Sequence, residues 1–309
     1  SVKQVKSKKI ISFAKNPQKK DTMHLYPIIL VAISCLYCQP TRRQSATPRV
    51  IITAPQGYAQ RLEKALQEKD IATYSCPMIE TKVLPEEAKM NQFLKEMQNY
   101  DYIAFSSRKA IESFSIALAK HPEAKLYLQQ ITLCAIGKDA EFLKKELKIS
   151  DVLLPDEASP MGIVAKLKTR PDISGKRIAV LAPWVKDIPE PDVVPDFTRA
   201  LEAIQMQVTR IDAYTTCASE ENIQNRFAEL IRTKTASCLV FTSGAEIEVA
   251  MQTCKKHHLS TDSLEIACFG PYTAAYARKK GLKVSIVAQD FSAFTGLATA
   301  IHQYYQNKK

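Results

Sequence analysis

The segment Ser237 to Met251, SCLVFTSGAEIEVAM, joins a continuous apolar run of strand length to a helical pattern that Gly244 opens. Ser243 is followed three residues later by Glu246. This is the spacing of a capping box, in which the serine accepts from the third helical N–H and the glutamate reaches back. We therefore expect a strand that ends in a bare helix N-terminus. Such an end presents unpaired N–H groups and a positive dipole, and it suits a carboxylate or a phosphate.

The same arrangement occurs a second time. Tyr102 to Phe114, YIAFSSRKAIESF, again passes from an apolar strand to a helical pattern through two small polar residues. The corresponding residues are Phe105, Ser106 and Ser107 in this copy, and Phe241, Thr242 and Ser243 in the other. Two more segments match, because LCAIGKDAEFLKKEL (133–147) resembles IACFGPYTAAYARKKGL (266–282), with Gly137 at the place of Gly270. The chain therefore holds two related α/β units.

A third pair of similar segments shows how the units are connected. RVIITAP (49–55) resembles RIAVLAP (177–183), and each leads through a helix to another strand. In the inner unit this segment and the strand that follows it stand at the end, whereas in the outer unit they stand at the start. One unit is therefore inserted into the other in permuted order, and the two chain crossings make a natural hinge.

Strands and helices alternate regularly between residues 102 and 214, which is typical of a parallel sheet. We predict an α/β fold of two doubly wound parallel-sheet lobes, one inserted into the other, joined by a two-crossing linker. Residues 71–79 and 151–155 are each expected to form a strand. The predicted boundaries are 49–79 plus 219–309 for lobe 1, 90–212 for lobe 2, and the polar stretches 80–89 and 213–218 for the crossings.

Composition narrows the class of protein. An apolar fraction of 46% and a charged fraction of 24% over 309 residues suit a soluble globular protein. The net charge is +11, but ten of the 43 Lys and Arg residues lie in residues 1–49, with one acidic residue. The rest of the chain is nearly neutral, so we expect no nucleic-acid partner. Cys134, Cys238 and Cys268 lie in apolar strand runs, which favours free thiols in a reducing, cytoplasmic location.

Residues 1–48 are a basic and apolar N-terminal extension. Its apolar run of 14 residues, Leu25 to Cys38, is short for a transmembrane helix. It fits a signal-peptide core, a signal anchor or an organellar presequence, and equally a disordered leader if Met23 is the initiator. An organellar or membrane-tethered location is thus the alternative, although we expect no stable membrane association of the folded body. Cys35 and Cys38 form a lone CxxC, for which we expect no metal or redox role.

The strand ends predict where a ligand binds, because open α/β sheets bind ligands outside the carboxyl ends of their strands. The cations Arg108, Lys109 and Lys138 lie near these ends, so a cleft there suits an extended ligand with many carboxylates. The four ends expected to line the cleft are Ser106 with Ser107, Gly137 with Lys138, Thr242 with Ser243, and Gly270 with Thr273.

Familiar catalytic patterns are missing from the sequence. It contains no GxxxxGK[ST], no GxGxxG and no GxSxG, and its five histidines are expected to be solvated surface residues. We expect neither a metal site nor a cofactor. This favours chemistry that depends on positioning the substrate.

Five segments together resemble the uroporphyrinogen-III synthase family: FSSRKAIESF, AIGKDA, FTSGAE, CFGPYTAAYARKKGLKV and DAYTT. The resemblance runs from about Arg49 to Tyr304, and GPYTAAYARKKGL is its most specific part. It implies a two-lobed, usually monomeric enzyme whose lobes are joined by a two-strand linker and which needs no cofactor. Such an enzyme takes hydroxymethylbilane, a linear tetrapyrrole with eight carboxylates, expels its terminal hydroxyl as water, and closes the ring with the fourth pyrrole inverted.

The resemblance also implies roles for single residues. Tyr214 of DAYTT falls on the family's tyrosine near the return linker, which is implied to donate a hydrogen bond or a proton to the leaving hydroxyl. Helix capping by the serines and threonines is compatible with contact to the substrate. Thr273 falls on a threonine of the family pattern, and Ser106, Ser107, Thr242 and Ser243 fall on its two Thr/Ser pairs. Together with the other residues at the strand ends, the predicted substrate-binding residues are Ser106, Ser107, Arg108, Gly137, Lys138, Thr242, Ser243, Gly244, Gly270, Tyr272 and Thr273.

This sequence departs from the family pattern in three places. Arg108 stands where the family often has proline, Tyr272 replaces a threonine, and the loop GKDA (137–140) lacks a hydroxyl. Two other functions therefore stay open. One is a two-lobed solute-binding protein for an anionic ligand, which an export signal in the N-terminal extension would favour. The other is an inactive interaction module on the same fold, which would bind without turnover.

Overall fold

The computed structural model describes residues 48–84 and 88–308. Our expectations for the N-terminal extension, including the apolar run and the CxxC motif, lie outside the described residues except at Pro48. Among the described helices, none is both long enough and apolar enough to span a bilayer.

Sheet A contains the strands of the outer unit, in the order β10-β9-β8-β1-β2, and all its neighbouring strands are parallel. Val50 and Ile52 pack with α1 and α10 on one face, whereas Ile51 packs with α7, α8 and α9 on the other. This alternation follows from the period of two along a strand. The strands are β1 (Arg49–Ile52), β2 (Ala72–Ser75), β8 (Cys238–Phe241), β9 (Glu265–Cys268) and β10 (Val284–Val287). The helices are α1 (Gln56–Gln67), α7 (Glu221–Arg232), α8 (Gly244–Lys256), α9 (Pro271–Lys279) and α10 (Phe294–Asn307).

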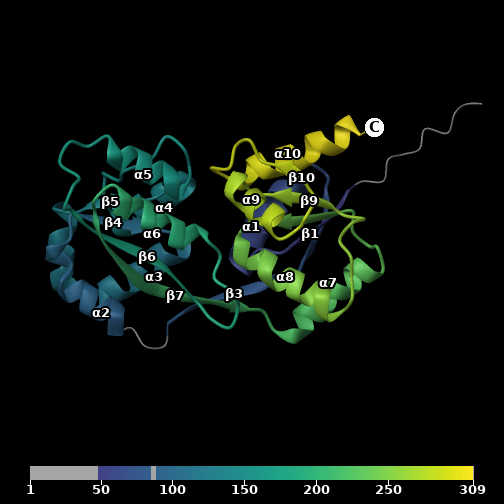
Figure 1. The fold of residues 1–309 in the computed structure, drawn as a ribbon, viewed down its shortest axis with the longest axis horizontal. Helices are drawn as coiled ribbons and strands as arrows, with labels where there is room; N and C mark the ends of the chain where they lie inside the picture. The colour runs from purple at the N-terminus through teal and green to yellow at the C-terminus, as the bar shows by residue number, and fades with distance from the viewer. Residues whose placement is uncertain (1–47, 85–87, 309) are drawn as a thin grey trace, which may run out of the picture. The chain divides into compact units, whose positions relative to one another are not determined.

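Sheet B has the order β3-β7-β6-β4-β5, in which the pair β3 and β7 is antiparallel and the other pairs are parallel. Helices cover both faces of each sheet (Figure 1). The strands are β3 (Ile79–Val83), β4 (Tyr102–Phe105), β5 (Thr132–Cys134), β6 (Arg177–Val185) and β7 (Gln207–Ala218). The helices are α2 (Ala88–Lys95), α3 (Arg108–Ala119), α4 (Gly137–Leu147), α5 (Pro160–Lys168) and α6 (Val193–Ala203), with the 3-10 helices η1 (Met97–Asn99) and η2 (Pro122–Gln129).

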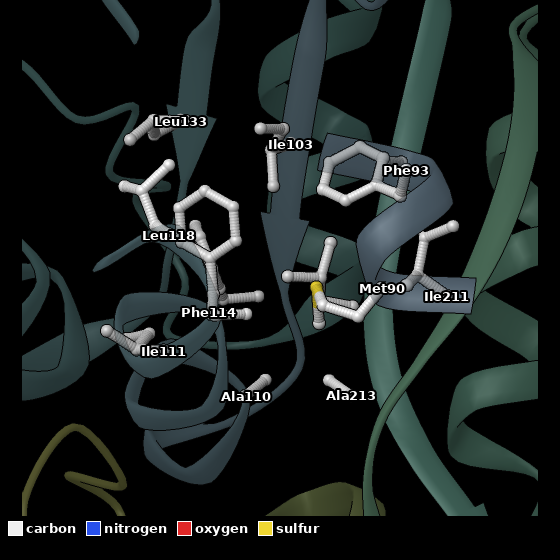
Figure 2. Close-up of a cluster of buried hydrophobic side chains, with 14 of the residues drawn as sticks. Met90, Phe93, Ile103, Ala110, Ile111, Phe114, Leu118, Leu133, Ile211 and Ala213 are labelled. Atoms are coloured by element: carbon white, nitrogen blue, oxygen red, sulfur yellow. The ribbon is translucent and has the colours of Figure 1, made fainter. Parts of the chain in front are cut away.

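The core under α2 and α3 is built from aromatic and aliphatic side chains. Figure 2 shows Phe93, Ile103 and Phe114 among them, and the rings of Phe93 and Phe114 lie 6.4 Å apart. Phe114 is fully buried, and burying such a side chain contributes roughly 1.5–3 kcal/mol. This packing holds the start of α3 against the end of β4, where two of the predicted site residues lie.

The predicted fold class is confirmed. All of sheet B comes from residues 79–218, between β2 and β8 of sheet A, so one α/β unit is inserted into the other. Part of each predicted crossing is a strand, because β3 enters the segment 80–89 and β7 runs through 213–218. β3 and β7 pair from Ile79 opposite Ala218 to Val83 opposite Tyr214. The precise lobe boundaries stay a prediction.

Two predicted strands were wrong. The segment 71–79 is not one strand, because β2 ends at Ser75 and Ile79 already belongs to β3. Pro77 lies between them, and a proline cannot donate to a strand ladder. The segment 151–155 forms only one isolated bridge, between Leu153 and Cys134.

Candidate active site

A cavity of about 700 Å³ lies where the carboxyl ends of strands from both sheets meet. Tyr214 lines it, together with most of the residues that the sequence predicted to bind substrate. Arg108 is the exception, because it is not among the lining residues. The predicted binding residues in the lining are Ser106, Ser107, Gly137, Lys138, Thr242, Ser243, Gly244, Gly270, Tyr272 and Thr273.

Tyr214 is held by the first residue before α3. Ser107 Oγ accepts a hydrogen bond from the N–H of Ala110 at 3.3 Å and donates to Tyr214 Oη at 2.8 Å. Since the only hydroxyl hydrogen of the serine is used, the phenolic hydrogen of Tyr214 is free to donate to a ligand. Burial raises the pKa of Tyr214, and the bond from Ser107 opposes this shift. The phenol is therefore a neutral donor at physiological pH.

The hydroxyl of Ser106 is also available to bind a ligand. Its Oγ is buried and makes no hydrogen bond of good geometry within the described residues, although it lies close enough to Tyr214 to oppose the rise in the pKa of that phenol. Because a buried hydroxyl without a partner is costly, a ligand that reaches this side of the cavity gains a contact there.

The N-terminus of α8 differs from the sequence prediction. The helix begins at Gly244 and Glu246 reaches back, both as expected, but the end is not bare, because this fully buried side chain covers it. Glu246 accepts from the N–H of Thr242 at 2.8 Å, from Thr242 Oγ1 at 2.5 Å and from Ser243 Oγ at 2.9 Å. Ser243 therefore donates to the carboxylate instead of capping a helical N–H. The anion that this N-terminus attracts is already supplied by the chain.

Two other helix N-termini at the cavity have no side-chain cap. These are the start of α9 after Gly270 and the start of α4 after Ile136. The N–H groups of Tyr272 and Thr273 have no acceptor within the described part of the chain. The N–H of Lys138 makes only a long contact, 3.5 Å, to the carbonyl of Ser292. These ends keep the capacity to bind anions that α8 has lost.

The predicted cations are already paired with carboxylates. Arg108 Nε lies 3.1 Å from Asp139 Oδ1, and its guanidinium covers the ring of Phe142. Lys109 and Lys138 pair within their own helices, with Glu112 at 3.2 Å and Glu141 at 3.0 Å. Burial raises the pKa of Asp139, although the charge of Arg108 opposes it. A role of Arg108 toward substrate stays a prediction.

Tyr272 is engaged across the two units. Its hydroxyl donates to Glu157 Oε1 at 2.8 Å and lies 3.3 Å from Ser159 Oγ, both in the segment before α5. Lys279 of α9 binds Asp192 at 2.5 Å. α9 therefore contacts the inserted unit at two points, and the Tyr272 hydroxyl has partners before any substrate arrives.

The comparison with protein families is decisive at this point. The family model described as "Uroporphyrinogen-III synthase HemD" matches residues 60–297. The chain belongs to the uroporphyrinogen-III synthase family. This membership argues against the solute-binding alternative. Among curated proteins, none matches the sequence.

Solved structures of uroporphyrinogen III synthases share this fold. A selenomethionine mutant of the enzyme from Thermus thermophilus is 14% identical, with a TM-score of 0.59 over 84% of this chain and 100% of that chain. The wild-type enzyme from the same bacterium, in another crystal form, is 15% identical, with a TM-score of 0.47 over 85% and 99%. The enzyme from Helicobacter pylori is 16% identical, with a TM-score of 0.46 over 83% and 100%. The TM-score of the Thermus mutant is high enough to show a shared fold, and at this low identity it shows the fold alone.

Part of the cavity wall of this synthase-family chain was not predicted from the sequence. Tyr58 and Arg61 of α1 and Phe294 of α10 also line it. Tyr58 and Arg61 are three residues apart, which places them on one side of the helix that follows β1. That spacing, directly after a strand that matches 177–183, was the available signal. Nothing local in the sequence indicates that Phe294 joins them.

Proposed function

We propose that the protein is a uroporphyrinogen-III synthase that cyclises hydroxymethylbilane with loss of water and inversion of ring D. The observation that supports this best is the pairing of Ser107 with Tyr214, which leaves a neutral phenolic O–H free at a cavity lined by both units. A polycarboxylate fits the uncapped starts of α4 and α9 beside it.

In this proposal the binding residues act by orientation. Hydroxymethylbilane closes unaided to the uninverted isomer, so an enzyme must hold its two ends in the geometry of a spiro intermediate. Fixing two reacting groups in this way contributes roughly 7–11 kcal/mol in favourable cases. The N–H groups at Lys138, Tyr272 and Thr273 would bind substrate carboxylates while the ends approach one another.

Tyr214 would assist the bond that breaks. The carbon–oxygen bond of the terminal hydroxymethyl group is cleaved, and the hydroxyl leaves as water after gaining a proton. A neutral phenol that donates a hydrogen bond to this oxygen lowers the barrier to its departure. The ring-A methylene carbon then bonds to the substituted α-carbon of ring D and forms the spiro intermediate. The bond between the ring-C methylene and ring D breaks, and this methylene bonds to the free α-carbon of ring D, which inverts the ring. Loss of the proton from that carbon restores the pyrrole and balances the proton taken up by the departing hydroxyl.

A coupled assay tests the function. Hydroxymethylbilane is generated in situ, the purified full chain is added, and the oxidised type I and type III uroporphyrins are separated by chromatography. We expect type III product without added metal or nucleotide. Type I alone from folded protein would contradict the proposal. Tight binding of a linear tetrapyrrole without turnover would instead support the inactive interaction module.

We also propose that the protein works as a monomer in the cytoplasm. The cysteines in the described part of the chain are free thiols, which supports a reducing compartment. Light scattering of the purified protein and fractionation of cells test these two points. A stable dimer or a vesicle-bound pool would contradict them.

A further inference from the structure

Most cations around the cavity are neutralised by carboxylates. Lys109 and Lys138 are paired within their helices, and Lys279 is bound by Asp192. Arg108, just behind the lining, is bound by Asp139. Each of these cations must exchange its present partner before it can bind a ligand.

Arg61 differs from all of these. It lines the cavity, yet it forms no ion pair and no hydrogen bond with any residue that the structure describes. Its guanidinium carbon lies 4.7 Å from the ring centre of Tyr58 and 5.0 Å from that of Phe294. Contact with two rings restrains the side chain. This contact uses none of the five N–H donors of the Arg61 guanidinium.

The surroundings of Arg61 make an anion favourable there. The side chain is half-buried, and burial lowers the pKa of its guanidinium. The like charge of Arg108 lowers this pKa further. Asp139 is already bound to Arg108 and forms no ion pair with Arg61, although its charge and that of Glu112 partly oppose the lowered pKa. A carboxylate that entered beside Arg61 would give this partly desolvated charge a direct hydrogen-bonded partner.

We propose that Arg61 is a substrate anchor, whose guanidinium binds one carboxylate of the linear tetrapyrrole through two parallel N–H···O bonds. This inference rests on the proposed function and identifies a positioning residue for it. The planar guanidinium matches the geometry of a carboxylate, which an ammonium group cannot do. Because Arg61 lies on α1 and Tyr214 lies on β7, the anchor acts from the outer unit on a substrate that reacts beside the inserted unit.

Steady-state kinetics of the full chain test the anchor. We expect Arg61→Gln to raise KM for hydroxymethylbilane by about 10- to 100-fold, since a hydrogen bond between charged groups is at stake, while kcat changes much less. Arg61→Lys keeps the charge but loses the paired geometry, so its KM should lie between those of the wild type and Arg61→Gln. The control is Arg232→Gln, on the exposed face of α7 outside the cavity lining, which should match the wild type.

A binding measurement separates positioning from folding. Uroporphyrin III, a stable and fluorescent octacarboxylate, is titrated into each variant, with circular dichroism to verify the fold. Its Kd should rise in Arg61→Gln by about the same factor as KM. Wild-type values of both KM and Kd in folded Arg61→Gln would overturn the proposal.

Two further outcomes are distinct. If the wild type yields only type I uroporphyrin, the proposed function fails, and the anchor fails with it only if Kd is also unchanged in Arg61→Gln. If Arg61→Gln does not fold, Arg61→Lys decides. A KM at least about fivefold above the wild type then supports the anchor, because the ammonium cannot form the paired bonds, and a wild-type KM overturns it.

Discussion

Ser107 Oγ donates a hydrogen bond to Tyr214 Oη across 2.8 Å, and this bond ties the start of α3 to β7. The same oxygen caps α3 by accepting from the N–H of Ala110. One hydroxyl group thus stabilises a helix and fixes the direction of the phenol. Both functions of Ser107 can be tested separately from the function of the tyrosine.

Replacing Tyr214 with phenylalanine should lower kcat for type III product by roughly tenfold or more, with little change in KM. The ring remains to fill its buried position, while the hydrogen bond to the leaving hydroxyl is lost. The quantity measured is the rate of type III formation in the coupled assay. Tyr127→Phe is the matched control, because Tyr127 packs against the same core and lies outside the cavity lining. Full activity of Tyr214→Phe would show that the assigned role is wrong.

The pH dependence of kcat gives an independent prediction for Tyr214. Burial raises the pKa of this phenol above its ordinary value of 10.0, so the protonated donor persists as pH rises toward that value. We expect the kcat profile to show no loss from tyrosine ionisation between about pH 7 and pH 9. A fall over this range that is absent in Tyr214→Phe would mean that the phenol ionises there.

Ser107→Ala should reduce both stability and turnover. Loss of the cap costs about 1 kcal/mol of unfolding free energy. Loss of the bond to Tyr214 lets the phenol take other orientations, and kcat should fall several-fold. Ser107→Thr, which keeps a hydroxyl, should recover most of both in urea denaturation and in the coupled assay. If Ser107→Ala changes stability alone, the bond does not orient the phenol.

Glu246 should make stability depend on pH. Burial raises its pKa above the ordinary value of 4.5, so the folded protein binds this proton more tightly than the unfolded chain does. Its contribution to the free energy of unfolding therefore decreases as pH rises above about 4.5. Thr53 Oγ1 lies 2.7 Å from Glu246 Oε2 and 2.6 Å from the carbonyl of Val240. The Thr53 hydroxyl has one hydrogen and can donate to only one of these two oxygens. When Glu246 is protonated, Thr53 donates to the carbonyl of Val240 and accepts from the carboxyl group of Glu246, so both contacts are hydrogen bonds.

Glu246→Gln tests this shift, because glutamine cannot ionise. The variant should be less stable than the wild type by about 1–2 kcal/mol at pH 5, and the difference should narrow by pH 8. Urea denaturation at both pH values measures it. Glu229→Gln on the exposed face of α7 is the control and should show no such trend. A difference that widens with pH would contradict the raised pKa.

Gly137→Ala should disturb the cavity wall. Gly137 has a φ of +50°, and an added Cβ would lie 2.9 Å from the carbonyl oxygen of Ser292. The left-handed backbone alone costs roughly 1–2 kcal/mol for alanine. Gly175 has a φ of +77° with no neighbour within 4 Å, so Gly175→Ala carries the backbone cost only. We expect Gly137→Ala to be the less stable of the two in thermal melts and to be the only one with reduced kcat/KM. Equal behaviour of both variants would exclude a role for the contact with Ser292.

Much of the fold could be predicted because its signals are local. The start of α8 at Gly244 and the start of α3 at Arg108 agree with the sequence patterns, since a strand end followed by small polar residues and a helical pattern depends on a few neighbouring residues. The strand over 71–79 was mispredicted because the apolar pattern continues across Pro77 while the chain changes sheets. Periodicity records burial and not the sheet in which a residue is buried.

The sequence by itself determined that this chain is an α/β protein of two related units, one inserted into the other, and it indicated the family. Only the tertiary structure decided what the polar groups at the helix starts bind. Glu246 takes the place expected for a ligand anion, partly because Thr53, 193 positions away in the sequence, lies 2.7 Å from its carboxyl group. Arg61 stays unpaired because α10 brings Phe294 against it. These partners are distant in the chain and are selected by packing, which no local pattern encodes.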